Sequence, residues 1–382
     1  MGCGCFTITQ SRSRSNGYRK AFKEYDVVPV SNSVASSEKD LLEIERVEQK
    51  FRSSTKVQPS VKELVNDKKV RRLPPVKETH ILIHNEDFEG NKMINEYVRE
   101  CKIGSGSYCK VVLHRGNKDG NLYAVKIFRK SRLGKIRASH SGNAMSKVLT
   151  EVSILKQVDH PNIVKLIEVI DDPDSDRFYM VLEYMERGWI FKGSGPSGGI
   201  GEGIARKYFQ DIVAGLKHLH SNNIVHGDIK PENLLVSSDG SVKICDFSES
   251  CKFEDNNDEL KRSAGTPVFT APECSQGFLY HGKVADIWAL GITLYCMVLG
   301  QFPFIGETLR ETFHKIVNHP MVVPDNFNTD LADLLNGLLC KDPMRRISLD
   351  EAMRHPWVVK GYGHLISRFE EMNSNSQKGW KG

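Results

Sequence analysis

The strongest constraint on the fold is a change in the apolar pattern partway along the chain. Short segments rich in Val, Tyr and Ile predict strands at Tyr97–Ile103, Cys109–His114, Asn121–Phe128, Ile163–Ile170 and Arg177–Tyr184. Beyond Gly201 helical spacing dominates, at Glu202–His220, Gly282–Gly300, Leu309–Val317, Thr329–Leu339 and Leu349–Arg354. A further helix is expected at Ala144–Val158. A strand-rich small lobe followed by a helical large lobe predicts an α+β architecture with a cleft between the lobes.

The ends of the chain lack this pattern. Residues 1–96 are rich in Ser and hold one helix-like segment, Glu38–Phe51, so we expect a mostly disordered region with a marginal helix. The expected organisation is a globular domain at 97–358, divided into a small lobe with hinge at 97–185 and a large lobe at 186–358, followed by a short tail at 359–382.

Charge and composition exclude several classes of protein. The chain has 382 residues and a net charge of +5. Most of the excess lies in residues 1–95, so the globular part is almost neutral and nucleic acid is not expected as a direct ligand. The apolar run Ile287–Leu299 is too short for a stable membrane span and predicts a core helix. Nine cysteines without metal-ligand spacing indicate free thiols in a reducing compartment.

A glycine-rich stretch separates the first two predicted strands. Ile103, Gly104, Ser105 and Gly106 precede Val111, and the glycines allow a tight turn and a close approach of backbone to phosphates. An ordinary hairpin explains the same pattern. A dinucleotide-binding loop is disfavoured because a strand, rather than a helix, follows.

A lysine lies inside the third apolar strand, in the run Ala124-Val-Lys126. A buried lysine is costly without a partner, so this residue either reaches solvent at the edge or binds phosphate while paired with a carboxylate. Glu151, on the following helix, is the natural partner.

Further motifs follow in a fixed order: His226-Gly-Asp-Ile-Lys-Pro-Glu-Asn233, Asp246-Phe-Ser248, Ala271-Pro-Glu273 and Asp286-Ile-Trp-Ala-Leu-Gly291. Together with the glycine-rich loop and Lys126, they resemble the eukaryotic protein kinases over about residues 97–357. The resemblance implies the two-lobed protein kinase fold, with ATP as the phosphate donor and Mg²⁺ as the metal.

The resemblance also implies the catalytic residues. Lys126, paired with Glu151, would hold the α- and β-phosphates, and Asp228 would accept the proton of the substrate hydroxyl. Lys230 would contact the γ-phosphate, and in this family such a lysine marks serine/threonine kinases.

The resemblance assigns Mg²⁺ to Asn233 and Asp246. It places the rest of the nucleotide against Ile103, Gly104, Ser105, Gly106, Val111, Ala124, Lys126, Glu183, Met185 and Leu235, with Leu182 as gatekeeper. Supporting roles are implied for His226 and Phe247 in packing, for Asp286 in holding the catalytic loop, and for an ion pair between Glu273 and Arg346.

Four residues depart from the usual kinase motifs: Cys109, Trp189, Gly227 and Ser248. None of these departures removes a charge that contacts phosphate or metal, so we expect an active enzyme. The alternatives are a catalytically weak kinase-fold scaffold and a serine/threonine kinase with another substrate. Cys109 and Cys245 are expected near the nucleotide, either as inert buried thiols or as oxidisable thiolates.

One subgroup of kinases fits best. The insert Gly193–Gly201 and the catalytic motifs resemble the plant geminivirus-Rep-interacting kinases, which are related to the calcium/calmodulin-dependent kinase kinases. The resemblance implies phosphorylation of the activation-loop threonine of downstream energy-sensing kinases, whose catalytic subunits would be the substrates, and binding to a geminivirus replication protein. The tail has no basic amphipathic helix, so calmodulin is not expected as a partner.

Regulation and location are the last expectations. Gly227 offers no cation to a phosphate on the activation segment, residues 246–273, so phosphorylation of Ser263 is not expected to be required for activity. Thr266 is expected to contact the catalytic loop. We expect the chain in the cytoplasm and, if 68–72 acts as an import signal rather than a solvated basic run, in the nucleus. Membrane attachment through Cys3 and Cys5 is less favoured than a free N-terminus.

Overall fold

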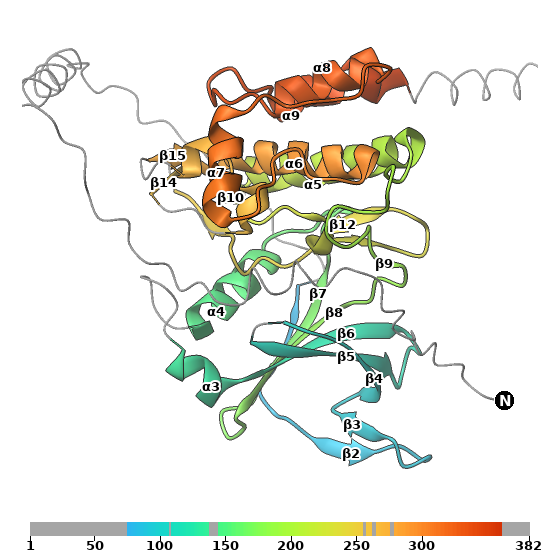
Figure 1. The fold of residues 1–382 in the computed structure, drawn as a ribbon. Helices are drawn as coiled ribbons and strands as arrows, with labels where there is room; N and C mark the ends of the chain where they lie inside the picture. Colours follow the sequence, from blue (N-terminus) through green and yellow to red (C-terminus); the bar gives the residue numbers. More distant parts are fainter. Residues whose placement is uncertain are drawn as a thin grey trace, which may run out of the picture. The chain divides into compact units, whose positions relative to one another are not determined.

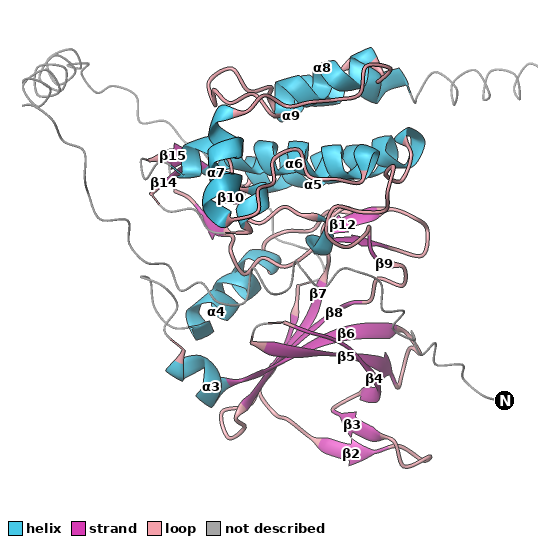
Figure 2. Cartoon of the chain, in the orientation of Figure 1, coloured by secondary structure: helices cyan, strands magenta, loops and turns pink. Residues whose placement is uncertain are grey.

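The computed structural model describes residues 75–106, 108–136, 144–254, 257–261, 265–275 and 279–360. Within them a strand-rich lobe and a helical lobe are joined by the segment that follows strand β8, as Figures 1 and 2 show. The expected α+β fold with two lobes is therefore confirmed. The expected helix at 38–51, the basic run 68–72, Cys3, Cys5, Ser263 and the tail beyond 360 lie outside the described residues.

The small lobe is one sheet of eight strands in the order β1-β7-β8-β6-β5-β4-β3-β2. Its strands are β1 (Lys77–Thr79), β2 (His84–Glu86), β3 (Lys92–Ile94), β4 (Tyr97–Ser105), β5 (Cys109–Gly116), β6 (Leu122–Arg129), β7 (Leu166–Asp171) and β8 (Arg177–Glu183). All neighbours are antiparallel except β1 and β7. Two helices, α3 (Lys130–Lys135) and α4 (Ala144–Leu155), lie between β6 and β7 in the chain.

Three of these strands correct the sequence analysis, which places residues 75–96 in a mostly disordered region. They extend the sheet at both edges, because β1 pairs with β7 and the β2–β3 hairpin pairs with β4. Glu168 of β7 is fully buried, and it accepts a hydrogen bond from the Tyr97 hydroxyl at 2.6 Å and pairs with Lys77 at 3.0 Å. A buried carboxylate needs such partners, so the N-terminal strands complete this part of the lobe.

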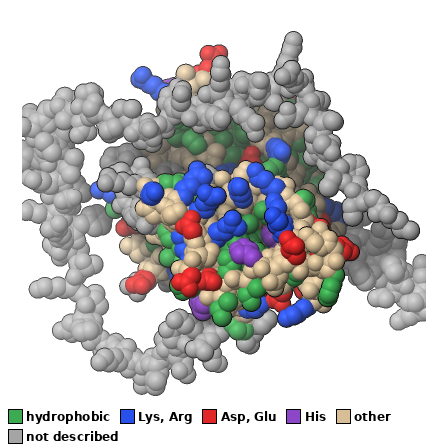
Figure 3. All heavy atoms as spheres, turned by 90° about the horizontal axis from the view of Figure 1, so that it is seen from below, with side chains coloured by type: hydrophobic (Ala, Val, Ile, Leu, Met, Phe, Trp, Pro, Cys, Tyr) green, Lys and Arg blue, Asp and Glu red, His purple; other side chains and the backbone are tan. Residues whose placement is uncertain are grey.

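Basic side chains gather on the face of the small lobe seen in Figure 3. Exposed Lys and Arg on the strands β4, β5, β6 and β8 are Arg99, Lys102, Lys110, Arg129 and Arg177. Because Arg129 and Arg177 are direct cross-strand partners, two like charges face each other at the end of the sheet.

The large lobe is built on helices α5 (Glu202–Ser221), α6 (Gly282–Leu299), α7 (Leu309–Asn318), α8 (Thr329–Leu338) and α9 (Leu349–Arg354). Its short strands are β9 (Gly188–Trp189), β10 (Ile224–Val225), β11 (Leu234–Val236), β12 (Val242–Ile244), β13 (Cys251–Lys252), β14 (Glu259–Leu260) and β15 (Tyr280–His281). The 3-10 turns are η1 (Pro231–Asn233), η2 (Pro267–Phe269) and η3 (Pro272–Ser275).

Helix α6 forms the centre of the large lobe. It is long and apolar enough to cross a membrane, but 78% of its most apolar window is buried inside the protein, as the sequence predicts for a core helix. Trp288 on α6 is fully buried and stacks on Phe304 with a centroid separation of 5.8 Å. The later helices begin at polar caps: Thr308 and Asn328 accept backbone hydrogen bonds, and Ser348 forms a capping box.

The expected ion pair between Glu273 and Arg346 is present. The guanidinium donates to both carboxylate oxygens, at 2.6 and 2.9 Å, and the side chain of Arg346 is fully buried. Arg346 also donates to the carbonyl oxygen of Val284 at the start of α6. This charge pair therefore joins the end of the activation segment to the core helix.

Candidate active site

Lys126 of the small lobe lies close to a carboxylate of the large lobe. Lys126 extends from β6, and its ammonium lies 2.7 Å from Glu151 on α4 and 3.6 Å from Asp246, which belongs to the large lobe. The structure thus brings together three of the residues that the sequence analysis singles out. It also decides between the two interpretations of Lys126, because this side chain is only 16% exposed and is paired with a carboxylate.

The charges of this cluster support one another. Burial alone would lower the pKa of Lys126, but the carboxylates of Glu151 and Asp246 outweigh it and hold the pKa above its ordinary value. Burial acts to raise the pKa of Asp246, and Lys126 together with a hydrogen bond from Ser248 more than offsets it, so this pKa is lowered. At neutral pH the lysine is therefore protonated and Asp246 is ionised.

The catalytic loop, residues 226–233, holds Asp228 in a fixed orientation. One carboxylate oxygen accepts from the Thr266 hydroxyl at 2.9 Å, and the other accepts from Lys230 at 2.5 Å and from the Asn233 amide at 3.1 Å. Lys230 also donates to the Thr266 hydroxyl at 2.8 Å. Thr266 contacts the catalytic loop as the sequence analysis expects, and the network leaves Asp228 little rotational freedom.

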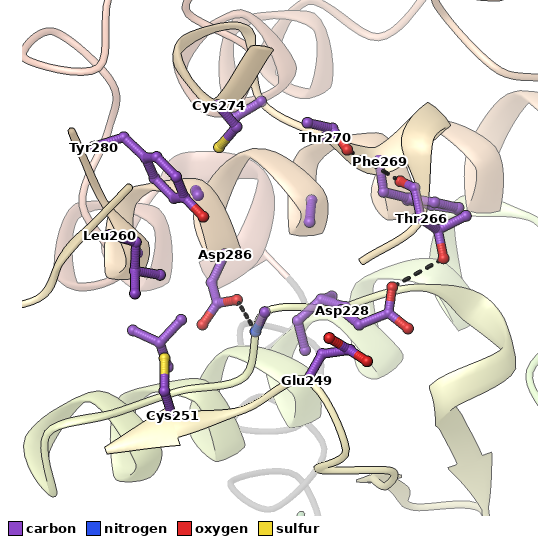
Figure 4. Close-up of a pocket in the computed structure, with 17 residues that line it drawn as sticks. Asp228, Glu249, Cys251, Leu260, Thr266, Phe269, Thr270, Cys274, Tyr280 and Asp286 are labelled. Atoms are coloured by element: carbon purple, nitrogen blue, oxygen red, sulfur yellow. Dashed lines mark hydrogen bonds between the residues drawn. The ribbon is translucent and has the colours of Figure 1, made fainter. Parts of the chain in front are cut away.

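The backbone of the catalytic loop is held by Asp286 at the start of α6. Its two carboxylate oxygens accept from the amides of His226 and Gly227, both at 2.9 Å, and His220 lies 2.9 Å from one of them. The carboxylate is buried and points at the loop backbone, as Figure 4 shows. His226 in turn packs edge-on against Phe247 at 5.1 Å. These contacts give Asp286, His226 and Phe247 the structural roles implied by the resemblance.

Two oxygen donors of this site fit Mg²⁺. Asp246 carries an ionised carboxylate, and the amide nitrogen of Asn233 donates to Asp228, which leaves the amide oxygen of Asn233 as a ligand. Asp246 also adopts a left-handed backbone conformation, with φ of 64°. No group of three His, Cys, Asp or Glu side chains arranged for a metal occurs in the part of the chain that the structure describes. Magnesium suits such a sparse set, because water and substrate phosphates supply its other ligands.

Four of the residues assigned to the nucleotide, Gly104, Val111, Ala124 and Lys126, lie on neighbouring strands of the small-lobe sheet. Gly104 pairs with Val111, Val111 with Lys126, and Ala124 with Leu182. Because side chains alternate along strands, Val111, Ala124 and Lys126 share one face. Ile103 is 40% exposed at the same end of β4. Ser105 ends this strand, and the amide of Gly106 donates to the carbonyl oxygen of Cys109, which closes the glycine-rich turn.

Glu183 ends β8, directly before the segment that joins the lobes. Its amide donates to the carbonyl oxygen of Lys165, so a backbone bond from Glu183 to a nucleotide would use its carbonyl oxygen. Its side chain pairs with Lys243 on β12, with distances of 2.8 and 2.9 Å, a contact that the sequence analysis missed. Met185 is buried, and Leu235 lies half-buried on β11 against the main core.

The departures from the usual motifs have distinct surroundings. Burial raises the pKa of Cys245 to about 12 and also raises that of Cys109, which favours the protonated thiol at both positions. Trp189 is 47% exposed and lies under the ammonium of Lys192 at 4.7 Å. Ser248 donates its amide to Asp246 in a long bond of 3.4 Å.

The glycine-rich insert forms a loop that contacts both α6 and the catalytic loop. Its Gly199 approaches Met297 and Val298 so closely that a Cβ atom there would lie 2.5 Å from their backbone oxygens. The amide of Gly193 donates to the carboxylate of Glu232 at 3.0 Å. Glycine is therefore required at position 199 by the packing against α6.

Known proteins place the chain in a family. A model of the protein kinase domain matches residues 97–358. This chain belongs to the protein kinase family. It is 58% identical over 297 residues to the serine/threonine-protein kinase GRIK2 of Arabidopsis thaliana, covering 77% of this chain and 73% of that protein. It is 52% identical over 371 residues to GRIK1 of the same plant, covering 97% and 93%.

More distant similarity reaches the calcium/calmodulin-dependent protein kinase kinase of Caenorhabditis elegans, at 41% identity over 288 residues, which cover 70% of this kinase and 53% of that protein. The similarity to the plant Rep-interacting kinases and to the calcium/calmodulin-dependent kinase kinases, which the sequence analysis expects, is confirmed. The kinase is thus a serine/threonine-protein kinase that uses ATP, and its substrates are proteins.

Proposed function

We propose that this kinase phosphorylates the activation-loop threonine of downstream energy-sensing kinases. The observation that carries the proposal is the similarity to GRIK1 over nearly the whole of both chains, together with the insert at 193–201 that marks the resemblance to the Rep-interacting kinases. The same resemblance supports a geminivirus replication protein as a partner and gives no role to calmodulin.

The geometry supports direct phosphate transfer to a hydroxyl. Asp228 accepts hydrogen bonds from Lys230 and Thr266 and would accept the proton of the attacking hydroxyl, while Lys230 would stabilise the charge of the transferred group. Lys126, held by Glu151, would position the phosphates of ATP. Mg²⁺, when bound by Asp246 and Asn233, would neutralise part of the phosphate charge.

The competing hypothesis of a catalytically weak scaffold requires a disrupted site. Lys126, Glu151, Asp228, Asn233 and Asp246 are instead all present, and the first two form a close ion pair. This arrangement favours an active enzyme.

The proposal is tested with catalytic subunits of candidate energy-sensing kinases that have been inactivated in their own active sites. Each is incubated with the purified kinase and ATP, and the modified residue is mapped by mass spectrometry. We expect modification at the activation-loop threonine, and none with the Asp228→Asn variant. Modification elsewhere, in subunits that keep this threonine unmodified, would exclude the proposed substrate while leaving the kinase activity intact.

A further inference from the structure

Helix α4 is tied to both lobes through its charged side chains. Among its twelve residues only Lys147 and Glu151 are charged, and a spacing of four places them on the same side of the helix. Glu151 pairs with Lys126 of the small lobe at 2.7 Å. Lys147 pairs with Glu249 at 2.5 Å. Glu249 lies three residues after Asp246, at the start of the activation segment, so one pair ties the helix to the sheet of the small lobe and the other ties it to the large lobe.

The backbone around Glu249 is held firmly against the catalytic loop. The hydroxyl of Ser250 donates to the carbonyl oxygen of His226 at 2.8 Å. The next residue, Cys251, pairs with Val225 in the short β10–β13 sheet. Figure 4 shows Glu249 beside this loop, among the residues that line a pocket behind it. The backbone that carries the Glu249 carboxylate is therefore held in place.

Gly227 makes this arrangement possible. Its φ of +79° lies in the left-handed region, and a Cβ atom there would lie 2.7 Å from the carbonyl oxygen of Glu249. Any side chain at this position would be strained and would push Glu249 away. Kinases with an arginine here have a cation that can bind a phosphate on the activation segment. This chain has no cation at position 227. Its activation segment instead contributes an anion, the carboxylate of Glu249.

We propose that Glu249 is a built-in anion that positions α4. Through Lys147 it holds the helix where Glu151 pairs with Lys126, so the lysine is aligned without a phosphate on the activation segment. Glu249 and Lys147 act as positioning residues, because neither is required to contact ATP or the substrate. The proposal explains how the loss of the arginine before Asp228 is compatible with an active enzyme.

The test compares single and double charge reversals in the full chain after phosphatase treatment. Lys147→Glu and Glu249→Lys should each lower kcat/KM for ATP roughly threefold to tenfold, since a partly exposed ion pair controls the helix position. The double variant, which restores an attractive pair, should recover to within about twofold of the unaltered kinase. The rate is measured as phosphate transfer to a protein that the unaltered kinase modifies.

Lys156→Met is the matched control. Lys156 follows α4 directly and pairs with Glu78 at 2.9 Å, but this pair does not involve the activation segment. The control should keep the full rate, and all variants should unfold at similar temperatures. Two results with the variants would overturn the proposal: single reversals that keep full activity, or a double variant that is no better than the weaker single one. Loss of activity on phosphatase treatment of the unaltered kinase would overturn it as well.

Discussion

The catalytic loop and helix α4 both position catalytic side chains, but they are held in different ways. The loop is anchored by Asp286, which is 1% exposed and bonds to two backbone amides and a histidine. Helix α4 relies on apolar packing and on ion pairs, and in the Lys147–Glu249 pair both side chains are close to 30% exposed. Buried hydrogen bonds are costly to break, whereas exposed ion pairs contribute little and are screened by salt. The loop is therefore the fixed part of the site, and α4 is the adjustable part.

The largest effect is expected from removing the anchor of the loop. Asp286→Ala leaves the buried amides of His226 and Gly227 without acceptors, and the free energy of unfolding should fall by about 3 kcal/mol. Chemical denaturation measures the change. Asp350→Ala is the matched control, because Asp350 is 63% exposed in its pair with Lys217 and its loss should destabilise the kinase far less. Equal losses in the two variants would contradict the role given to Asp286.

The next effect concerns chemistry on the fixed loop. Asp228→Asn should lower the rate by at least about 10²-fold, because the side chain no longer accepts the hydroxyl proton. The affinity for ATP and the unfolding temperature should stay close to those of the unaltered kinase, since the anchor at Asp286 is intact. Steady-state kinetics and calorimetry separate the two quantities. A variant with full activity would remove Asp228 from the mechanism.

A smaller effect is expected where the loop meets the activation segment. Gly227→Ala and Gly240→Ala both introduce a side chain at positive φ, of 79° and 81°. Gly240→Ala should lose about 1 kcal/mol of stability, and Gly227→Ala should lose more because its Cβ would lie 2.7 Å from a backbone oxygen. Only Gly227→Ala should also slow catalysis, by roughly tenfold, because its Cβ would meet the backbone of Glu249. At position 240 the nearest atoms are the flexible ends of Arg187 and Lys207. Equal kinetics in the two variants would mean that the close approach at Gly227 does not matter for catalysis.

The smallest effect is expected at Cys245, which directly precedes Asp246. Burial raises the pKa of this thiol to about 12, so the thiol keeps its proton well above neutral pH. Alkylation by a neutral maleimide should be slow at pH 7 and should speed up about tenfold per pH unit towards pH 10, as the thiolate fraction grows. Among the cysteines that the structure describes, exposed Cys101 should react first at neutral pH. Peptide mapping over a pH series checks both statements, and a pH-independent rate at Cys245 would contradict the protonated state.

Most regular elements were predictable because their signals are local. Periodicity located the core strands and helices of both lobes, and α6 was recognised as a core helix from its length and apolar content. The strands β1–β3 were missed because they are only three residues long, and their sequences, such as His84–Glu86, carry no apolar alternation. They form because distant partners, including Glu168 and Tyr97, give them a place at the edges of the sheet.

The sequence by itself determined the family and the chemistry, because the charged side chains that contact phosphate and metal must occur in motifs of fixed order. The tertiary structure alone decided how those side chains are held. Lys147 and Glu249 are 102 positions apart, and neither stands out in its own segment. The close approach of Gly227 to Glu249 likewise depends on how two loops pack. Such contacts follow from the folding of the whole domain, so no local pattern of residues reveals them.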